Sequence, residues 1–295
     1  MTPQTANDGA VGPLIDDDLG VALAYDVPGG RLYRYRRFDQ AELQSLIVAG
    51  QIRFADASYF NDPWDCRPRI LAEQPKCTAD RERIVEEFKA TSAKVNPGMP
   101  GSVIDRAAEI FRNDPAAQQR FYDDRMRDFL PQLRRRYPVL CLSTSASVAL
   151  MWSHYASGHH GVCLIFNART EEMSAACQVQ YAHDYPAITM PSEPARDVLV
   201  KTMLTKPDDW QYESEYRLLA REHREGDDTE WSPIARNGMV TLSYDAFVGL
   251  ILGASMDDAQ ARAARDLIRA APRRLELWRA ELHIDRYELK FHREL

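Results

Sequence analysis

Two glutamates separated by one residue, Glu213 and Glu215, are the side chains of this sequence best suited to chemistry. They stand at the expected start of a strand, where alternate residues point to the same face, so the two carboxylates would share one site. Like charges this close raise one pKa, which suits cleavage of a glycosidic bond: one carboxylate stabilises an oxocarbenium-like centre and a second group activates the acceptor. The spacing by itself, however, favours two solvated acids on an edge strand beside Arg217.

Two arginines and a serine-rich segment are further candidates for a binding site. Arg34 and Arg36 share one face of an expected strand at 31–38 and could hold a diphosphate or a carboxylate through paired hydrogen bonds. Ordinary surface charge explains them as well, because Tyr33 and Tyr35 supply the buried face of that strand. Ser143-Thr144-Ser145 ends an apolar strand, where Ser143 and Ser145 could orient a carboxylate or a ribose, or could form a plain turn.

An aromatic cluster and scattered histidines complete the candidates. Trp152 and Tyr155 could form a wall that stacks on nicotinamide or adenine, although as core residues they need no ligand. The histidines at 154, 159 and 160 have no carboxylate or thiol at a zinc-like spacing, so we expect no metal site. The five cysteines are scattered without a C-x-x-C pair, and we interpret all five as buried structural thiols of a reducing compartment.

The elements that must position these residues form an α+β pattern. Strands are expected at 31–38, 51–55, 139–144, 162–166, 178–181, 216–221 and 247–252, with a strand or hairpin at 274–291. Helices are expected at 39–50, 151–156 and 195–204, and at 255–271 with Ser255 as cap. Residues 78–136 predict a helical insertion that ends in a solvated Arg134-Arg135-Arg136. No glycine-rich phosphate loop is present, so the sequence predicts a mixed, split sheet rather than a Rossmann fold.

Composition sets the class of protein. The 295 residues are 45% hydrophobic, enough for one large domain at 31–295, preceded by an expected mobile leader at 1–30. The sequence has neither a signal peptide pattern nor an apolar run long enough for a membrane span, which favours a cytoplasmic protein without a membrane partner. A formal charge of -7 argues against a general electrostatic grip on nucleic acid.

Four motifs, in order, resemble an uncharacterised bacterial family, a domain of unknown function. They are Leu32-Tyr33-Arg34-Tyr35-Arg36, Phe60-Asn61-Asp62-Pro63-Trp64-Asp65, Met151-Trp152-Ser153-His154-Tyr155-Ala156, and the segment from Trp210 to Arg217. The resemblance covers about residues 31–292 and by itself implies no reaction.

A more distant resemblance does imply a reaction. Mono-ADP-ribosyltransferase toxins of the arginine, serine-threonine-serine and Glu-x-Glu type carry these three features in the order found here. The resemblance implies that Arg34 or Arg36 holds NAD, with Ser143 and Ser145 bracing the site; we prefer Arg36, because the pattern of the uncharacterised family places its arginine there. It further implies that Glu215 stabilises the oxocarbenium and Glu213 positions or deprotonates the acceptor. Residues 206–212, with exposed Trp210 and Tyr212, would recognise the substrate.

The sequence therefore predicts an NAD-dependent ADP-ribosyltransferase-like enzyme, a toxin or phage-defence type of effector, with NAD as substrate and a protein or nucleic acid as acceptor. An NAD glycohydrolase, in which water replaces the acceptor, is the nearest alternative. A non-catalytic module that binds nucleotide or nucleic acid by charge and stacking is the third; the paired carboxylates, which repel phosphate, argue against it.

Overall fold

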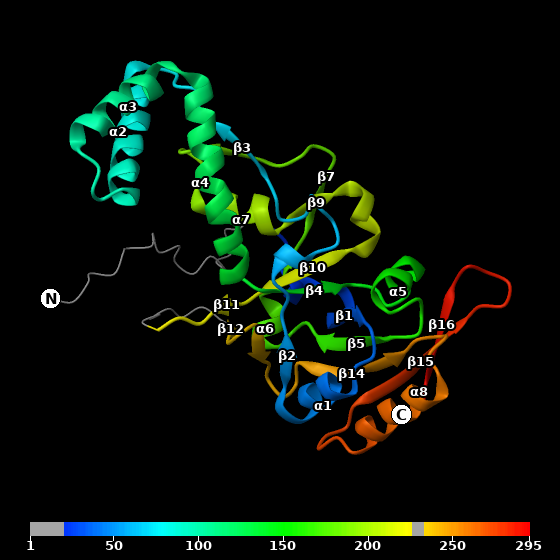
Figure 1. Ribbon diagram of the computed structural model, residues 1–295. Helices are drawn as coiled ribbons and strands as arrows, with labels where there is room; N and C mark the ends of the chain where they lie inside the picture. Colours follow the sequence, from blue (N-terminus) through cyan, green and yellow to red (C-terminus); the bar gives the residue numbers. More distant parts are fainter. Residues whose placement is uncertain (1–20, 226–232) are drawn as a thin grey trace.

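One large mixed sheet runs through the computed structural model, which describes residues 21–225 and 233–295 (Figure 1). Its eight strands are β1 (Arg31–Arg36), β4 (Val139–Ser143), β5 (Val162–Asn167), β6 (Cys177–Gln178), β10 (Glu215–Leu219), β14 (Phe247–Leu252), β15 (Glu276–Leu282) and β16 (Leu289–Arg293). They lie in the order β16-β15-β14-β5-β1-β4-β10-β6. Only β14 and β15 pair in parallel; all other neighbours are antiparallel. The sheet and its helices confirm the mixed architecture expected from the sequence.

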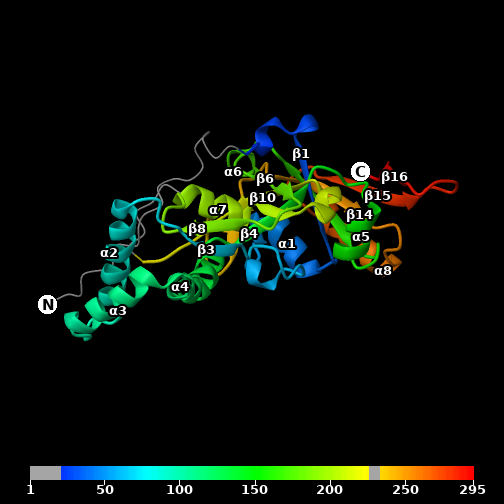
Figure 2. The same cartoon turned by 90° about the horizontal axis from the view of Figure 1, so that it is seen from above.

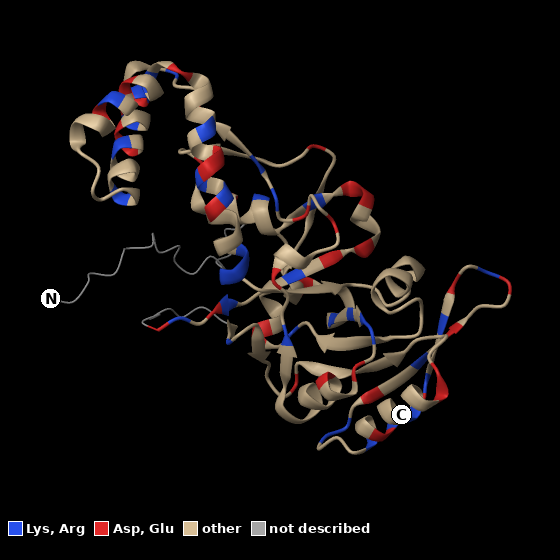
Figure 3. Ribbon diagram, in the orientation of Figure 1, with Lys and Arg blue, Asp and Glu red and all other residues tan. Residues whose placement is uncertain are grey.

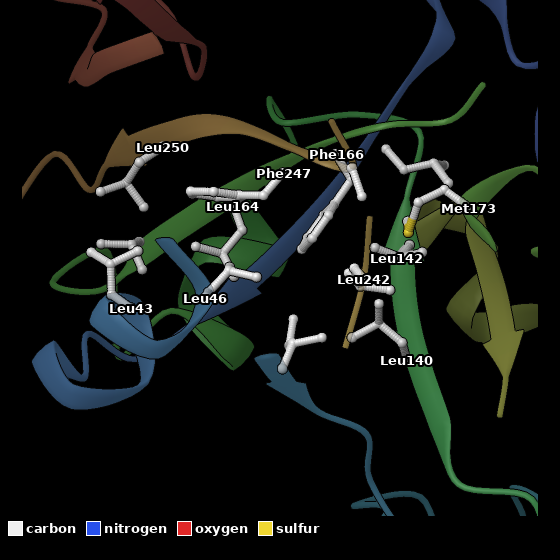
Figure 4. Packing of buried hydrophobic residues seen from close by; sticks show 14 of the residues in the cluster. Leu43, Leu46, Leu140, Leu142, Leu164, Phe166, Met173, Leu242, Phe247 and Leu250 are labelled. Atoms are coloured by element: carbon white, nitrogen blue, oxygen red, sulfur yellow. The ribbon is translucent and has the colours of Figure 1, made fainter. Parts of the chain in front are cut away.

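Helices α1 (Gln40–Ala49) and α8 (Asp258–Arg269) pack on one face of this sheet. Asp39 caps α1 by accepting a hydrogen bond from the backbone of Glu42 at 3.0 Å, and Gly50 ends it in the left-handed region at φ 66°. Figure 4 shows side chains of α1 against those of the sheet, among them Leu43, Leu46, Leu164 and Phe166. This apolar contact is the main core of the molecule.

The start of α8 differs from the expected one. The helix begins at Asp258, and Asp257 caps it by accepting from the backbone N–H groups of Ala259 and Gln260. Ser255 lies outside the helix, and its N–H donates to the carbonyl of His159 at 3.0 Å. A carboxylate two residues later thus takes the capping role, which aspartate fills at least as well as serine.

The short helix α5 (Ala149–Tyr155) covers the opposite face, next to the tyrosines of β1. Trp152 is 0% exposed, and its ring meets that of Tyr35 edge-on at 5.2 Å between centroids. Its Nε1 donates to the carbonyl of Ala146 at 2.8 Å. Trp152 therefore fills the core and has no free face for a planar ligand, contrary to the expected stacking wall.

Residues 78–136 form three helices that extend away from the sheet: α2 (Thr78–Val95), α3 (Gly101–Asn113) and α4 (Pro115–Arg136). Figures 1 and 2 place them at the opposite end of the molecule from the β15–β16 hairpin. Phe88 and Phe111 stack at 4.3 Å in a core of their own. This core also contains side chains of the parallel pair β3 (Arg69–Ala72) and β8 (Ala187–Met190).

Three sequence interpretations need correction in these peripheral parts. Arg134 is buried rather than solvated, and its Nε and Nη2 both donate to the carbonyl of Cys66. Cys77 is exposed at the N-terminus of α2, so not all five thiols are buried. Residues 21–30 form the turns η1 (Ala24–Asp26) and η2 (Pro28–Gly30), and Ala24 and Val27 lie in the core. Packing thus begins before Arg31, while the rest of the expected leader lies outside the described residues.

The remaining elements are short. They are β2 (Gln51–Arg53), η3 (Ala57–Tyr59), α6 (Glu171–Ser174), β7 (Gln180–Ala182), α7 (Ala195–Met203), β9 (Thr205–Pro207), η4 (Asp208–Glu213), β11 (Arg221–Glu222), β12 (Ile234–Ala235) and β13 (Met239–Thr241). Among the helices of the described ranges, none is long and apolar enough to cross a membrane.

Candidate active site

Three of the motifs meet on neighbouring strands, because β4 lies between β1 and β10. Ser143 pairs with Tyr33 on one side and with Glu215 on the other. Residues paired directly across strands point to the same face, so these three side chains form one row across the sheet. Ser143 and Glu215, which are 72 positions apart in the chain, thus come into direct register.

The two glutamates come together, but their backbone conformation is not the continuous strand expected from the sequence. Glu213 ends η4, Ser214 takes the left-handed conformation at φ 44°, and Glu215 begins β10. Both side chains reach Lys206, whose Nζ lies 2.5 Å from Oε2 of Glu213 and 3.2 Å from Oε2 of Glu215. They are only 2% and 3% exposed, and β10 is not an edge strand. The interpretation as solvated edge acids is therefore wrong.

Arg217 fixes Glu215 from the other side and is itself 0% exposed. Its guanidinium donates to Glu215 from Nε and Nη2 at 2.9 and 3.2 Å. It also donates to Asp65 from Nη1 and Nη2 at 3.0 and 2.5 Å, and to the carbonyl of Met203 at 2.8 Å. The ring of Phe60 lies 5.2 Å from the guanidinium carbon. A continuous buried ion network therefore runs from Asp65 to Glu213.

This environment separates the pKa values of the two carboxyls. Burial acts to raise the pKa of Glu215, but the positive charges of Arg217 and Lys206 outweigh it and lower that pKa to about 2. Burial also raises the pKa of Glu213, and there the opposing effect of Lys206 does not bring it back to its ordinary value. Glu215 therefore stays ionised, whereas Glu213 is the more basic of the two and can exchange a proton.

Aromatic side chains cover Glu213. The hydroxyl of Tyr155 donates to its Oε1 at 2.8 Å, and Ser143 Oγ donates to its backbone carbonyl at 2.7 Å. The Trp210 ring lies over Lys206, with 4.9 Å between Nζ and the ring centroid, and Tyr212 lies 6.0 Å from Trp210. Trp210 and Tyr212 are half-buried rather than exposed as expected. This cover separates the carboxylate pair from solvent.

The two arginines of β1 are less well placed than the serine. Arg36 forms an ion pair with Glu42 of α1 and lines a cavity of about 230 Å³ beside α1, on the face opposite the carboxylates. Arg34 donates from Nη1 to the carbonyl of Cys141 on β4 at 3.2 Å. Burial lowers the pKa of Arg34, and the negative charge of Glu215 acts against that shift. Arg34 is thus within electrostatic reach of the pair, and Arg36 is held elsewhere.

Ser145 lies one step outside the row. Its N–H donates to Ser143 Oγ at 3.2 Å, its carbonyl accepts from the Tyr35 hydroxyl at 2.8 Å, and its own hydroxyl meets that of Ser147. These bonds shape the turn after β4, which in turn orients Ser143.

Sequence reasoning missed three members of the network: Lys206, Asp65 and Tyr181. The hydroxyl of Tyr181 accepts from the N–H of Glu215 at 2.8 Å. Asp65 belongs to one of the four family motifs and Lys206 begins the expected recognition segment, so the sequence points to both positions but predicts no chemical role for either side chain.

Within residues 21–225 and 233–295, no three His, Cys, Asp or Glu side chains are grouped to hold a metal ion.

A family model described as a protein of unknown function (DUF2971) matches residues 151–218. This segment contains Tyr155, Lys206, Glu213, Glu215 and Arg217, so it spans most of the buried network. The match supports the expected resemblance to an uncharacterised domain over that part of the chain. No curated protein and no solved structure matches the chain.

Proposed function

We propose that the Glu213–Glu215 site cleaves the bond between nicotinamide and ribose in NAD and transfers ADP-ribose to an acceptor, as an ADP-ribosyltransferase-like enzyme does. The observation that carries the proposal is the pair of buried carboxyls with opposite pKa shifts, one of them in register with Ser143. Cleavage of a glycosidic bond needs one group that remains anionic and another that exchanges a proton.

Each residue has a part in this reaction. The C–N bond breaks with its electron pair leaving on nicotinamide, and the anionic Glu215 stabilises the positive charge that develops on the ribose. Glu213 takes the proton that the acceptor loses as the new bond to ribose forms. Neither arginine of β1 is assigned to the diphosphate, because Arg36 is paired with Glu42 and Arg34, next to Tyr33 in the strand, points to the face opposite Glu215.

Access to this site requires a movement of its cover. Both carboxylates are nearly inaccessible, so NAD reaches them only when the segment of Trp210 and Tyr212 moves aside. Closure over a bound substrate would then exclude water and strengthen the electrostatic stabilisation.

NAD hydrolysis is the second candidate, and one observation favours it. Both carboxylate oxygens of Glu213 are already bonded, to Tyr155 and Lys206. A site so tightly filled admits a water molecule more readily than the side chain of a macromolecule. Nicotinamide release without a labelled acceptor identifies this reaction.

The decisive experiment incubates the protein with adenylate-labelled NAD and a bacterial lysate, comparing wild type with Glu215→Gln. The substitution removes the charge and keeps the shape, and we expect it to reduce both labelling and nicotinamide release by about 100-fold or more. Glu288→Gln, in the exposed β15–β16 hairpin at the other edge of the sheet, is the matched control and should keep full activity. Thermal melting of each variant establishes that it is folded.

The outcomes separate the candidate functions. Equal turnover by wild type and folded Glu215→Gln would mean that the catalytic assignment is wrong. If wild type neither consumes NAD nor binds it in calorimetry, the network has a structural role and the proposal fails.

A further inference from the structure

The loop that carries Asp65 has an outer surface that the carboxylate site does not use. Tyr59 is 86% exposed and Trp64 is 61% exposed, whereas Asp62 and Asp65 of the same loop are 5% and 4% exposed. Loops at a protein surface normally expose their charged residues and bury large aromatic ones. The reversal leaves two aromatic rings facing solvent and withdraws the negative charges.

A third exposed aromatic residue, Tyr185, lies beside this loop. It is 45% exposed, and its hydroxyl donates to the carbonyl of Arg67. The N–H of Arg69 donates to the carbonyl of Pro186 at 2.8 Å, which holds the two segments together. Between residues 50 and 75 and between 180 and 190, the exposed large hydrophobic side chains are all aromatic. A surface whose large exposed hydrophobic side chains are aromatic is suited to stacking on planar rings rather than to packing against an apolar protein face.

Exposed arginines belong to the same loop and to the end of α4 that is bonded to it. Arg67, Arg69 and Arg135 are exposed, and none of the three has an ion pair within residues 21–225 and 233–295. Arg134 joins the end of α4 to the loop through its hydrogen bonds to the carbonyl of Cys66 at 3.0 and 2.5 Å. Figure 3 shows the basic residues at this lower end of α4.

Few negative charges oppose these arginines. The acidic residues of the same segments are the aspartates 56, 62, 65 and 184 and the glutamate 73. Asp62 and Asp65 are buried. Asp56 accepts hydrogen bonds from Ser58 and Glu73 is paired with Arg83, and both are half-buried, so only Asp184 is exposed. The accessible part of the surface is therefore positive, although the whole chain carries a charge of -7.

We propose that this outer-loop surface, formed by Tyr59, Trp64, Arg67, Arg69 and Tyr185, binds single-stranded nucleic acid. Aromatic rings stack on unpaired bases and free guanidinium groups bind phosphates, which is the usual combination for single strands. Paired bases do not expose their ring faces, so a duplex cannot use the aromatic residues. The inference goes beyond the proposed function, because binding at this surface needs neither NAD nor the carboxylate pair.

Fluorescence anisotropy with a labelled 20-nucleotide single strand of mixed sequence, as RNA and as DNA, tests the proposal against the corresponding duplexes. Trp64→Ala should weaken binding of the single strand about 5- to 150-fold, the effect of losing one stacked base. Replacing Arg67 and Arg69 with alanine should reduce the slope of log K against log salt by about 1.4. Tyr287→Ala is the matched control, because it removes an aromatic ring that is more exposed than Trp64 from the β15–β16 hairpin.

The RNA and DNA arms identify the nucleic acid, and preference for either single strand supports the proposal. Three results would overturn it: no binding by wild type, equal binding of the duplex, or equal weakening by Trp64→Ala and Tyr287→Ala. None of these results affects the NAD assay, so the two proposals fail separately.

Discussion

Arg217→Met should reveal how strongly the buried network depends on its central cation. Methionine is apolar and unbranched and reaches only as far as the Nε position, so it fills the space of the aliphatic stem of Arg217 without replacing the charge or the hydrogen bonds of the guanidinium. Asp65 would lose its bidentate partner, and Glu215 would keep only Lys206. Because both carboxylates would remain buried, the substitution creates uncompensated negative charge rather than a simple cavity.

Two routes give the expected magnitude. Breaking a buried ion pair by removing one partner costs about 3–5 kcal/mol. Independently, lowering the pKa of Glu215 from 4.5 to about 2 corresponds to about 3 kcal/mol of stability at pH 7. In a chain of 295 residues, such a loss lowers Tm by about 5–8 °C.

The change of stability with pH gives a second expectation, whose direction follows from the pKa of Glu215. In wild type the folded-state pKa of Glu215 is depressed, so its stabilising contribution is present above the unfolded pKa and is lost as pH falls from about 4.5 toward about 2. In Arg217→Met the buried carboxyls of Asp65 and Glu215 resist ionisation, so their pKa values rise. The free-energy cost of keeping them ionised in the folded state is therefore largest at neutral pH. The difference in stability between the two proteins should therefore narrow as pH falls from 7 to 4.5.

Thermal melting and urea unfolding at pH 7 and pH 4.5 measure this difference. Arg286→Met, at an exposed arginine of the β15–β16 hairpin, is the control and should change stability by less than about 0.5 kcal/mol. If Arg217→Met loses less than about 1 kcal/mol at pH 7, or if its deficit is the same at both pH values, the reasoning about the network is refuted.

Two further predictions concern the neighbourhood of the network. Tyr155→Phe removes the hydrogen bond to the ionised form of Glu213, so the pKa of Glu213 should rise and the acidic limb of the pH profile for NAD cleavage should move to higher pH; an unchanged limb would exclude Glu213 as the proton acceptor. Gly161→Ala should cost about 1–3 kcal/mol in urea unfolding, because its Cβ would lie 2.3 Å from the carbonyl oxygen of Arg36. Gly98→Ala, with nothing within 4 Å of its Cβ, should be neutral, and equal melting of the two glycine variants would contradict this explanation.

Elements governed by local interactions were predictable from the sequence. The strand at Phe247–Leu252 has the expected bounds, and α1 begins and ends within one residue of the expected range. In both cases the signals lie within the segment: a run of apolar residues, an aspartate cap and a glycine suited to positive φ. The start of α8 was misplaced because Ser255 and Asp257 are both competent caps, and which residue caps depends on where the backbone turns.

The candidate site was predictable only as a set of residues. Glu213, Glu215 and Ser143 could be named because motifs mark them, and their shared location follows from the order of strands, which the sequence does not specify. Trp152 is an aromatic residue suited equally to a ligand wall and to a core. The structure assigns it to the core, because the edge-on contact with Tyr35 and the bond to Ala146 satisfy it completely.

Glu213 and Glu215 separate what the sequence determines from what the tertiary structure decides. Their identity, their spacing and the expectation of a strand after them come from the sequence alone. Their burial, their separate pKa values and their partners come from tertiary structure, because Asp65 lies 152 residues from Arg217 and reaches it only through folding. Local sequence determines which charges exist, whereas packing determines how far each charge is removed from water and which opposite charge it meets.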